Sequence, residues 1–196
     1  VPSAPADVEV LVLEVGSRGL GHIRNLVEVV RPDIAVITGI GASHLATLGD
    51  IETVRRAKWE LVEGLIAGGV AILPAADATL ADWAARDGVA VHSFGEGGDV
   101  RIEGLTLDGM ARPAFTLEAG GERVDLKLSM AGAHQARNAA AAAAAGMALG
   151  RALPDISAGL ELVHGSAWRM DVTPGAHTVV NDAYNANPDS MAAALE

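Results

Sequence analysis

The sequence predicts an α/β fold: a doubly wound, mostly parallel sheet flanked by helices, with a small antiparallel β meander attached. Three observations support this prediction. Short, almost continuously apolar runs alternate with helical patterns over residues 8–92, as expected of parallel strands buried on both faces. Three short strand patterns separated by Gly turns follow over residues 100–128. A very Ala-rich helical stretch covers residues 134–149.

The first half of the chain is predicted to alternate strands with helices. Four buried strands are expected at Val8–Val15, Ile34–Thr38, Val70–Leu73 and Val89–His92. The helices between them are expected around Leu20–Val30, Ile51–Ile66 and Thr79–Arg86, with Asp50 as the N-cap of the second.

The second half is predicted to begin with the antiparallel meander and to end in helices and one further strand. The meander strands are expected at Val100–Leu107, Arg112–Leu117 and Arg123–Leu128. The later elements are expected as helices at His134–Leu149, Pro154–Val163 and Asp189–Leu195, and as a strand at Thr178–Val180.

Composition limits the classes of protein to consider. With 196 residues, the chain is long enough for one domain with a sizeable core, or for one domain plus a short appendage. The absence of cysteine excludes disulfides and thiolate metal sites and fits a cytoplasmic protein. No apolar run is long enough to span a membrane, and a net charge of −11 argues against a broad nucleic-acid surface. The first residue is Val1, so we expect the chain to begin inside a longer protein.

A polar cluster follows the last predicted strand, over Asn181–Pro188. Polar groups at a strand exit lie where an open α/β sheet binds ligands, at the carboxyl edge of its strands. Amide, carboxylate and phenol groups within this segment give it many hydrogen-bond donors and acceptors. Asn, Asp and Pro also favour turns for local reasons, so a plain polar turn is the alternative.

Lys58 lies on the apolar stripe of the predicted helix Ile51–Ile66, in line with Val54, Leu61 and Leu65. A bare ammonium facing the core would be costly and would tend to lose its charge. One interpretation places the stem on apolar surface and the head group in water. The other is a modified lysine, such as a carbamate that acts as a metal-binding carboxylate.

Glu14 ends the first predicted strand and His44 follows the second, so both are expected at one edge of the sheet. A carboxylate and an imidazole there could bind a divalent metal, and Mg²⁺ accepts carboxylate ligands in phosphate sites. The alternative for each is a locally hydrogen-bonded polar group, because His is not a typical Mg²⁺ ligand. The spacing of Gly16, Gly19 and Gly21 matches neither the dinucleotide fingerprint nor a P-loop, which argues against a Rossmann dehydrogenase.

Two more side chains are candidates for ligand binding. Asn138 shares a face with His134 at the start of the Ala-rich helix, at a spacing of four. Arg169 precedes the final strand and could contact phosphate or sugar. A surface ion pair is the alternative for this arginine.

Taken together, six stretches of the chain resemble the Mur ligase family, most closely the type that adds D-alanyl-D-alanine. They occur in family order and cover nearly the whole chain. The stretches are Leu13–Gly19, Gly41–His44, Ala57–Leu61, Gly132–Ala140, Trp168–Met170 and Asn181–Pro188. The last is the most specific, because it separates this type from the other Mur ligases.

The resemblance implies an ATP-dependent amide ligase of peptidoglycan precursor synthesis, which joins D-alanyl-D-alanine to UDP-N-acetylmuramoyl-tripeptide. ATP would activate a substrate carboxylate as an acyl phosphate, and the amine of D-alanyl-D-alanine would then attack it. Such chemistry relies chiefly on positioning and charge neutralisation. By this analogy Glu14 would ligate the Mg²⁺ held with the ATP phosphates. His44 and a carbamylated Lys58 would support a second Mg²⁺ near the acyl phosphate and would serve as the catalytic residues.

The resemblance also implies a set of nucleotide contacts. Asn138 would contact adenine, and Arg169 and Asp182 would face the ribose and phosphates of ATP. Tyr184 and Asn185 would lie beside the nucleotide at the junction with the next domain.

Three departures from the family pattern stand out. The family usually has Asn where this chain has Gly39, and Phe-Gly-Ser where it has Leu48–Asp50. The phosphate-binding G-x-x-G-K-[ST] loop is absent from the sequence and is expected upstream of Val1.

The expected organisation follows from the same resemblance. Residues 1–183 would form the central ATP-binding domain without its P-loop, and residues 184–196 the hinge and the start of the C-terminal domain. One alternative is a non-catalytic binding module that kept the fold, and another is a different ligase of the superfamily, such as a folylpolyglutamate synthetase-like enzyme. We expect a monomer that binds no nucleic acid, does not insert into membranes and is inactive as this segment alone.

Overall fold

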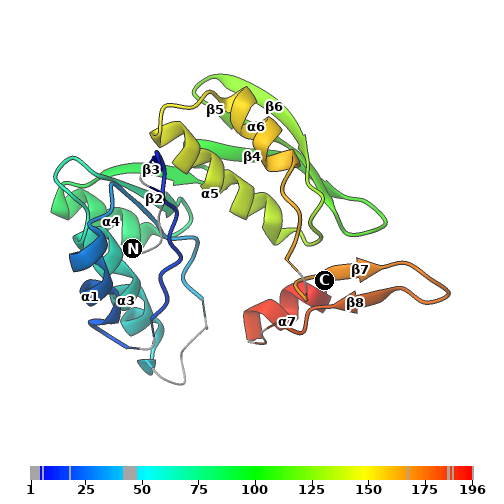
Figure 1. Ribbon diagram of the computed structural model, residues 1–196, viewed down its shortest axis with the longest axis horizontal. Helices are drawn as coiled ribbons and strands as arrows, with labels where there is room; N and C mark the ends of the chain where they lie inside the picture. The colour runs from blue at the N-terminus through cyan, green and yellow to red at the C-terminus, as the bar shows by residue number, and fades with distance from the viewer. Residues whose placement is uncertain are drawn as a thin grey trace.

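The main sheet joins a parallel half to an antiparallel half (Figure 1). The computed structural model describes residues 5, 7–17, 19–41, 48–166, 168–184, 186 and 188–195. Within these ranges six strands pair in sequence order, parallel from the first to the fourth and antiparallel from there on. They are β1 (Ile34–Val36), β2 (Val70–Pro74), β3 (Ala90–Phe94), β4 (Val100–Leu107), β5 (Pro113–Ala119) and β6 (Glu122–Lys127).

Helices cover both faces of the parallel half, which confirms the doubly wound fold. On β2, Ile72 packs into a core shared with α5 (His134–Ala148), whereas Ala71 and Leu73 face α3 (Ile51–Glu63) and α4 (Ala78–Asp87). Side chains that alternate between two buried faces explain why this strand is continuously apolar. Figure 1 shows α1 (His22–Val30), α3 and α4 gathered at one end of the molecule and α5 crossing toward the antiparallel strands.

The antiparallel half completes the core beneath α5. Phe115 and Leu117 of β5 and Leu126 of β6 are buried against the small side chains of α5. The helix α6 (Leu153–Glu161) follows α5 and packs beside it. Because Ala is small, α5 can approach the sheet closely along most of its length. None of the helices in the described ranges has the length and apolar character needed to cross a membrane.

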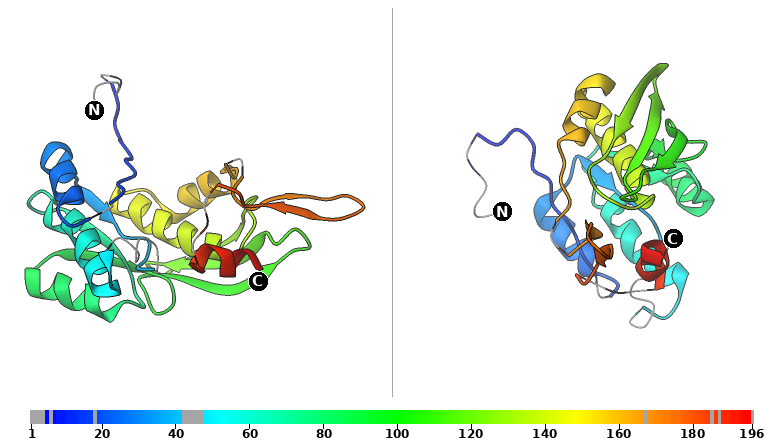
Figure 2. Two further views of the ribbon diagram at one scale, coloured as in Figure 1. Left: turned by 90° about the horizontal axis from the view of Figure 1, so that it is seen from below. Right: turned by 90° about the vertical axis from the view of Figure 1, so that its right-hand side faces the viewer.

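The predicted strand at Val8–Val15 is wrong. This segment has no strand structure and most of it is exposed, with Val12 87% accessible. A buried strand must pair its backbone groups with a neighbour, and this segment pairs with none of the described strands. Figure 2 shows it leaving the body of the molecule as an extended coil.

The last predicted strand forms, but not in the main sheet. Val179–Asn181 (β8) pairs antiparallel with Asp171–Thr173 (β7), and the two make a separate two-stranded sheet. The prediction that this strand continues the main parallel sheet is therefore wrong, and β7 was not predicted. The helix α7 (Pro188–Leu195) follows as expected.

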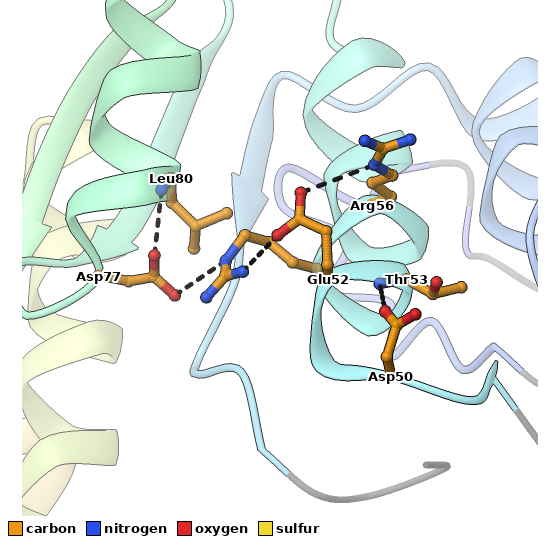
Figure 3. A network of polar contacts seen from close by, with 7 residues as sticks. Asp50, Glu52, Thr53, Arg56, Asp77 and Leu80 are labelled. Atoms are coloured by element: carbon orange, nitrogen blue, oxygen red, sulfur yellow. Dashed lines mark hydrogen bonds and ion pairs between the residues drawn. The ribbon is translucent and has the colours of Figure 1, made fainter. Parts of the chain in front are cut away.

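The helix α3 is held at both its start and its side by polar contacts (Figure 3). The Asp50 carboxylate accepts a 2.7 Å hydrogen bond from the Thr53 amide, which confirms the predicted N-cap. Arg55 reaches from α3 to Asp77, 3.4 Å away, while Asp77 caps α4 by accepting from the Leu80 amide at 3.1 Å. These contacts fix α3 and α4 side by side on one face of the sheet.

A buried carboxylate joins α3 to α1. Glu60 is only 4% exposed, and its two oxygens accept from the amides of Gly21, at 2.6 Å, and Arg24, at 3.1 Å. These are the N-cap and N3 amides of α1. In a capping box, the side chains of the N-cap and N3 residues of the same helix would satisfy these two amides. Gly21 has no side chain and a φ of 83°, so Glu60 satisfies both amides from another helix.

We expect Glu60→Gln to destabilise the fold by about 2 kcal/mol, because the amide group that replaces one oxygen faces an N–H donor and leaves it unsatisfied. Urea unfolding followed by circular dichroism measures the change. The matched control is Glu63→Gln on the same helix, since Glu63 forms an exposed ion pair with Arg24. A Glu60→Gln variant no less stable than the Glu63→Gln variant would show that the double cap contributes nothing.

Candidate functional site

Lys58 points from α3 to the exit of β1. Its Nζ donates a 2.5 Å hydrogen bond to the carbonyl oxygen of Gly39, three residues after the strand ends. The side chain is half-buried, and this burial lowers the pKa of the Lys58 amine. The stem is partly covered, as the first interpretation from the sequence expected, but the head group binds a backbone carbonyl at the carboxyl edge of the sheet. The carbamate stays a prediction.

The start of α5 brings a histidine to this edge. His134 folds back over Gly132, whose φ is 105° and where any Cβ would collide with the imidazole ring. Glycine is therefore required there. Burial lowers the pKa of His134, the nearby Arg137 acts in the same direction and the carboxylate of Asp182 opposes them. These electrostatic contacts show that the start of α5 and the end of β8 lie close together.

Arg137 brings the start of α5 close to the β1 exit that Lys58 contacts. Its Nη2 lies 3.6 Å from the position that a Cβ on Gly39 would occupy. Lys58 and Arg137 therefore approach the same glycine, one at its carbonyl oxygen and the other at its Cα. The site thus combines α3, the β1 exit, α5 and β8.

The base of the β7–β8 hairpin gathers three of the predicted nucleotide contacts. Asp182 accepts a 3.0 Å hydrogen bond from the Met170 amide, and the Tyr184 amide donates to the Trp168 carbonyl at 3.0 Å. The Arg169 guanidinium lies 3.9 Å from the centre of the Tyr184 ring. Stacked in this way, the cation keeps its edge donors available to an oxyanion.

The backbone around Arg169 is strained. Its neighbours Trp168 and Met170 have φ values of 67° and 47°, which non-glycine residues rarely adopt. Two hydrogen bonds hold this conformation: the Met170 amide donates to Asp182, and the Tyr184 amide donates to the Trp168 carbonyl. Strain held by surrounding contacts is typical of functional sites, so it supports a binding role for this segment.

The other predicted site residues are either exposed or outside the described residues. Asn138 is exposed on α5, one turn after His134, and its amide donates to Gln135 at 3.1 Å. Glu14 is exposed in the coil that replaced the predicted strand. His44 and Asn185 lie outside the described residues. Among the residues that are described, no three His, Asp or Glu side chains are grouped closely enough to hold a metal.

Two hollows lie away from this site. They are lined by the segment between α3 and β2, around residues 65–69, and one of them extends to Gly88 and Val89 before β3. These residues precede the strands, so the hollows are at the amino edge of the sheet. The candidate site is at the opposite edge, where α/β folds bind ligands.

Reasoning from the sequence missed Glu60, Arg137 and the carbonyl of Gly39. Arg137 follows His134 by three residues, so its place on the same helix face was a usable signal. Glu60 follows Lys58 by two residues, which places it on another face of α3, but nothing local indicated its partners in α1. The role of the Gly39 carbonyl oxygen could not be predicted from the sequence, because every residue has a backbone carbonyl.

Comparison with known proteins identifies the family of this chain. The family model of the Mur ligase middle domain matches residues 3–146. A UDP-N-acetylmuramoyl-tripeptide–D-alanyl-D-alanine ligase of Mycobacterium tuberculosis is 37% identical over 191 residues, which are 95% of this chain and 38% of that protein. The ligase of the same name from Bacillus subtilis is 33% identical over 198 residues, 100% of this chain and 42% of the relative. The chain therefore spans about two fifths of the length of the curated relatives that it matches.

Solved structures agree with the sequence comparison. A crystal structure of MurF from Acinetobacter baumannii superposes with a TM-score of 0.86 at 37% identity, over 92% of this chain and 40% of that one. A pseudomurein peptide ligase from Methanothermus fervidus shares the fold at a TM-score of 0.79, with 19% identity over 93% of this chain and 44% of its own. From the family model, the relatives and the fold, we conclude that this chain belongs to the Mur ligase family.

Proposed function

We propose that the chain is the central, nucleotide-binding part of an ATP-dependent ligase that adds D-alanyl-D-alanine to UDP-N-acetylmuramoyl-tripeptide. The observation that carries the proposal is the half-buried Lys58 amine on the Gly39 carbonyl, at the sheet edge where α5 and the β7–β8 hairpin also meet. The names of the relatives supply the substrates. Residues 1–183 form the central domain in this proposal, and residues 184–196 the hinge to a following domain.

The donor types present fit ATP and Mg²⁺. Asn138 offers an amide for adenine, Asp182 a carboxylate for ribose hydroxyls, and Arg169 on Tyr184 a cation for phosphate. Glu14 and a Lys58 carbamate would supply the oxygen ligands that Mg²⁺ prefers. Asn185 and His44 are proposed to join the nucleotide and metal contacts respectively.

The chain's own residues would position and neutralise the reactants. When bound, ATP supplies the phosphoryl group that activates the substrate carboxylate. Arg169 would hold phosphate oxygens, and Asp182 would keep the strained Trp168–Met170 segment in its binding conformation. Lys58 would hold the β1 exit through Gly39 or, as a carbamate, offer negative charge to a cation.

The cellular setting follows from this proposed reaction. A precursor carrying UDP is made in the cytoplasm, so we place the intact protein there, as a monomer. Its product would enter peptidoglycan and so link the protein to cell shape and division.

We expect Lys58 to form a carbamate with CO₂. The neutral amine attacks CO₂, forms an N–C bond and releases one proton, and the lowered pKa raises the fraction of neutral amine near neutral pH. With ¹³CO₂, a lysine carbamate signal should appear in the ¹³C spectrum beside that of the N-terminal α-amine and grow as the pH rises. The chain has only two lysines, so Lys127→Arg should keep this signal and Lys58→Arg should lose it. A signal that follows Lys127 instead would contradict the assignment.

We expect Asp182→Ala in the intact protein to weaken binding of an ATP analogue about tenfold, because the Met170 amide loses its acceptor and the Arg169 segment is released. Isothermal titration calorimetry gives the change in Kd. Thr173→Ala, at the loop end of the hairpin where Thr173 pairs with Val179, is the control. Unchanged affinity in the Asp182 variant would remove this residue from the nucleotide site.

We expect the 196-residue chain alone to form no amide product from ATP, UDP-N-acetylmuramoyl-tripeptide and D-alanyl-D-alanine. Its sequence lacks the G-x-x-G-K-[ST] loop that cradles phosphates. The longer polypeptide containing this chain should form the product, which mass spectrometry detects. An inactive longer polypeptide would favour a non-catalytic module, and glutamate addition to a folate in its place would favour a folylpolyglutamate-type ligase.

A further inference from the structure

Arg137 is a cation without a fixed partner at the centre of the candidate site. It is exposed in the first turn of α5, and among the described residues it forms neither an ion pair nor a hydrogen bond. Nearly all the other arginines with described contacts meet a carboxylate, as Arg101 and Arg123 do on the antiparallel sheet. Arg137 instead extends its guanidinium to the backbone of Gly39.

The missing side chain at Gly39 makes room for this guanidinium. A Cβ on Gly39 would lie 3.6 Å from Nη2 of Arg137, which is ordinary van der Waals contact. A longer side chain on that Cβ would compete with the guanidinium for the same space. The departure at Gly39, where the family usually has Asn, and the presence of Arg137 are thus connected in space.

Arg137 is a positive charge beside this glycine that no carboxylate of the described residues pairs with. Lys58 donates to the Gly39 carbonyl from one side, and Arg137 lies against the glycine from the other. Asp182 is within electrostatic range of His134, but it accepts a hydrogen bond from the Met170 amide and forms no ion pair with Arg137. A guanidinium at the carboxyl edge of a parallel strand can hold an oxyanion with two parallel hydrogen bonds.

We propose that Arg137 binds an oxyanion of the ligand beside Gly39, a role that rests on the proposed ligase function. The oxyanion is either the terminal phosphate of ATP or the carboxylate of the tripeptide substrate. Arg137 thus supplies, from α5, a polar group at a position where the β1 exit of this chain offers none. This substrate-binding role of Arg137 depends on glycine at position 39.

The first test is Arg137→Ala in the intact enzyme, with separate saturation curves for ATP and for UDP-N-acetylmuramoyl-tripeptide. We expect kcat/KM to fall about tenfold to hundredfold for the ligand whose oxyanion is bound, as for loss of a charged hydrogen bond. A change confined to the ATP curve would identify the ATP phosphate as the oxyanion that Arg137 binds. A change confined to the tripeptide curve would identify the carboxylate of the tripeptide. Arg137→Lys should recover part of the loss, because it restores the positive charge but not the paired N–H donors of the guanidinium.

The control is Arg151→Ala, which removes the same charge about 20 Å away, beyond the other end of α5. It should leave both curves unchanged. Wild-type activity with Arg137→Ala within twofold on both curves would overturn the inference and leave the proposed function standing. If the wild type forms no product, the proposed function fails, and equilibrium binding of ATP and of the tripeptide to wild type and Arg137→Ala still decides the role of Arg137.

A double-mutant cycle tests the shared space directly. Gly39→Asn should reduce kcat/KM or binding in the wild type, because its side chain displaces the guanidinium. In the Arg137→Ala background the same substitution should cost little, so the two effects are not additive. Additive effects would mean that the two positions act separately and would contradict the geometry. Thermal unfolding of each variant identifies any loss that comes from the fold.

Discussion

The buried carboxylate of Glu60 is the contact on which the arrangement of the candidate site depends. A carboxylate with almost no access to water must have its acceptors satisfied, and Glu60 achieves this only with the first turn of α1 against α3. Two residues earlier, Lys58 ties the same helix to the exit of β1. One helix therefore holds both the start of α1 and the exit of β1, so the position of the β1 exit depends on helix packing.

The Ala-rich helix α5 provides the second constraint. Its small side chains are buried against both halves of the sheet, and a Cβ on Gly146 would lie only 2.9 Å from Cδ1 of Ile156 in α6. Such close packing leaves little freedom for the helix to slide or rotate. Its first turn, which carries His134 and Arg137, is therefore held in place by contacts far from the site.

Local patterns in the sequence were sufficient to predict most of the fold and part of the site. The Asp50 cap and the inward position of Lys58 depend on neighbours within one or two turns, and both were predictable. The Val8–Val15 segment has the composition of a buried strand, but a strand also needs a hydrogen-bonding neighbour, which composition does not reveal. Glu60 and Arg137 lie against residues far away in the chain, so their roles emerged only once the helices were placed.

The outer side of β1 has a consequence for how this chain behaves at high concentration. Among the described strands β1 is at the edge of the sheet. The coil at Val8–Val15 and the outward face of α1 add exposed aliphatic side chains such as Val12 and Val29, which are 87% and 80% accessible. An open strand edge near apolar surface is a template for pairing between molecules. The large negative charge opposes such association by mutual repulsion, and salt screens that repulsion. Colloidal stability of the isolated chain should therefore depend on ionic strength far more than its folding does.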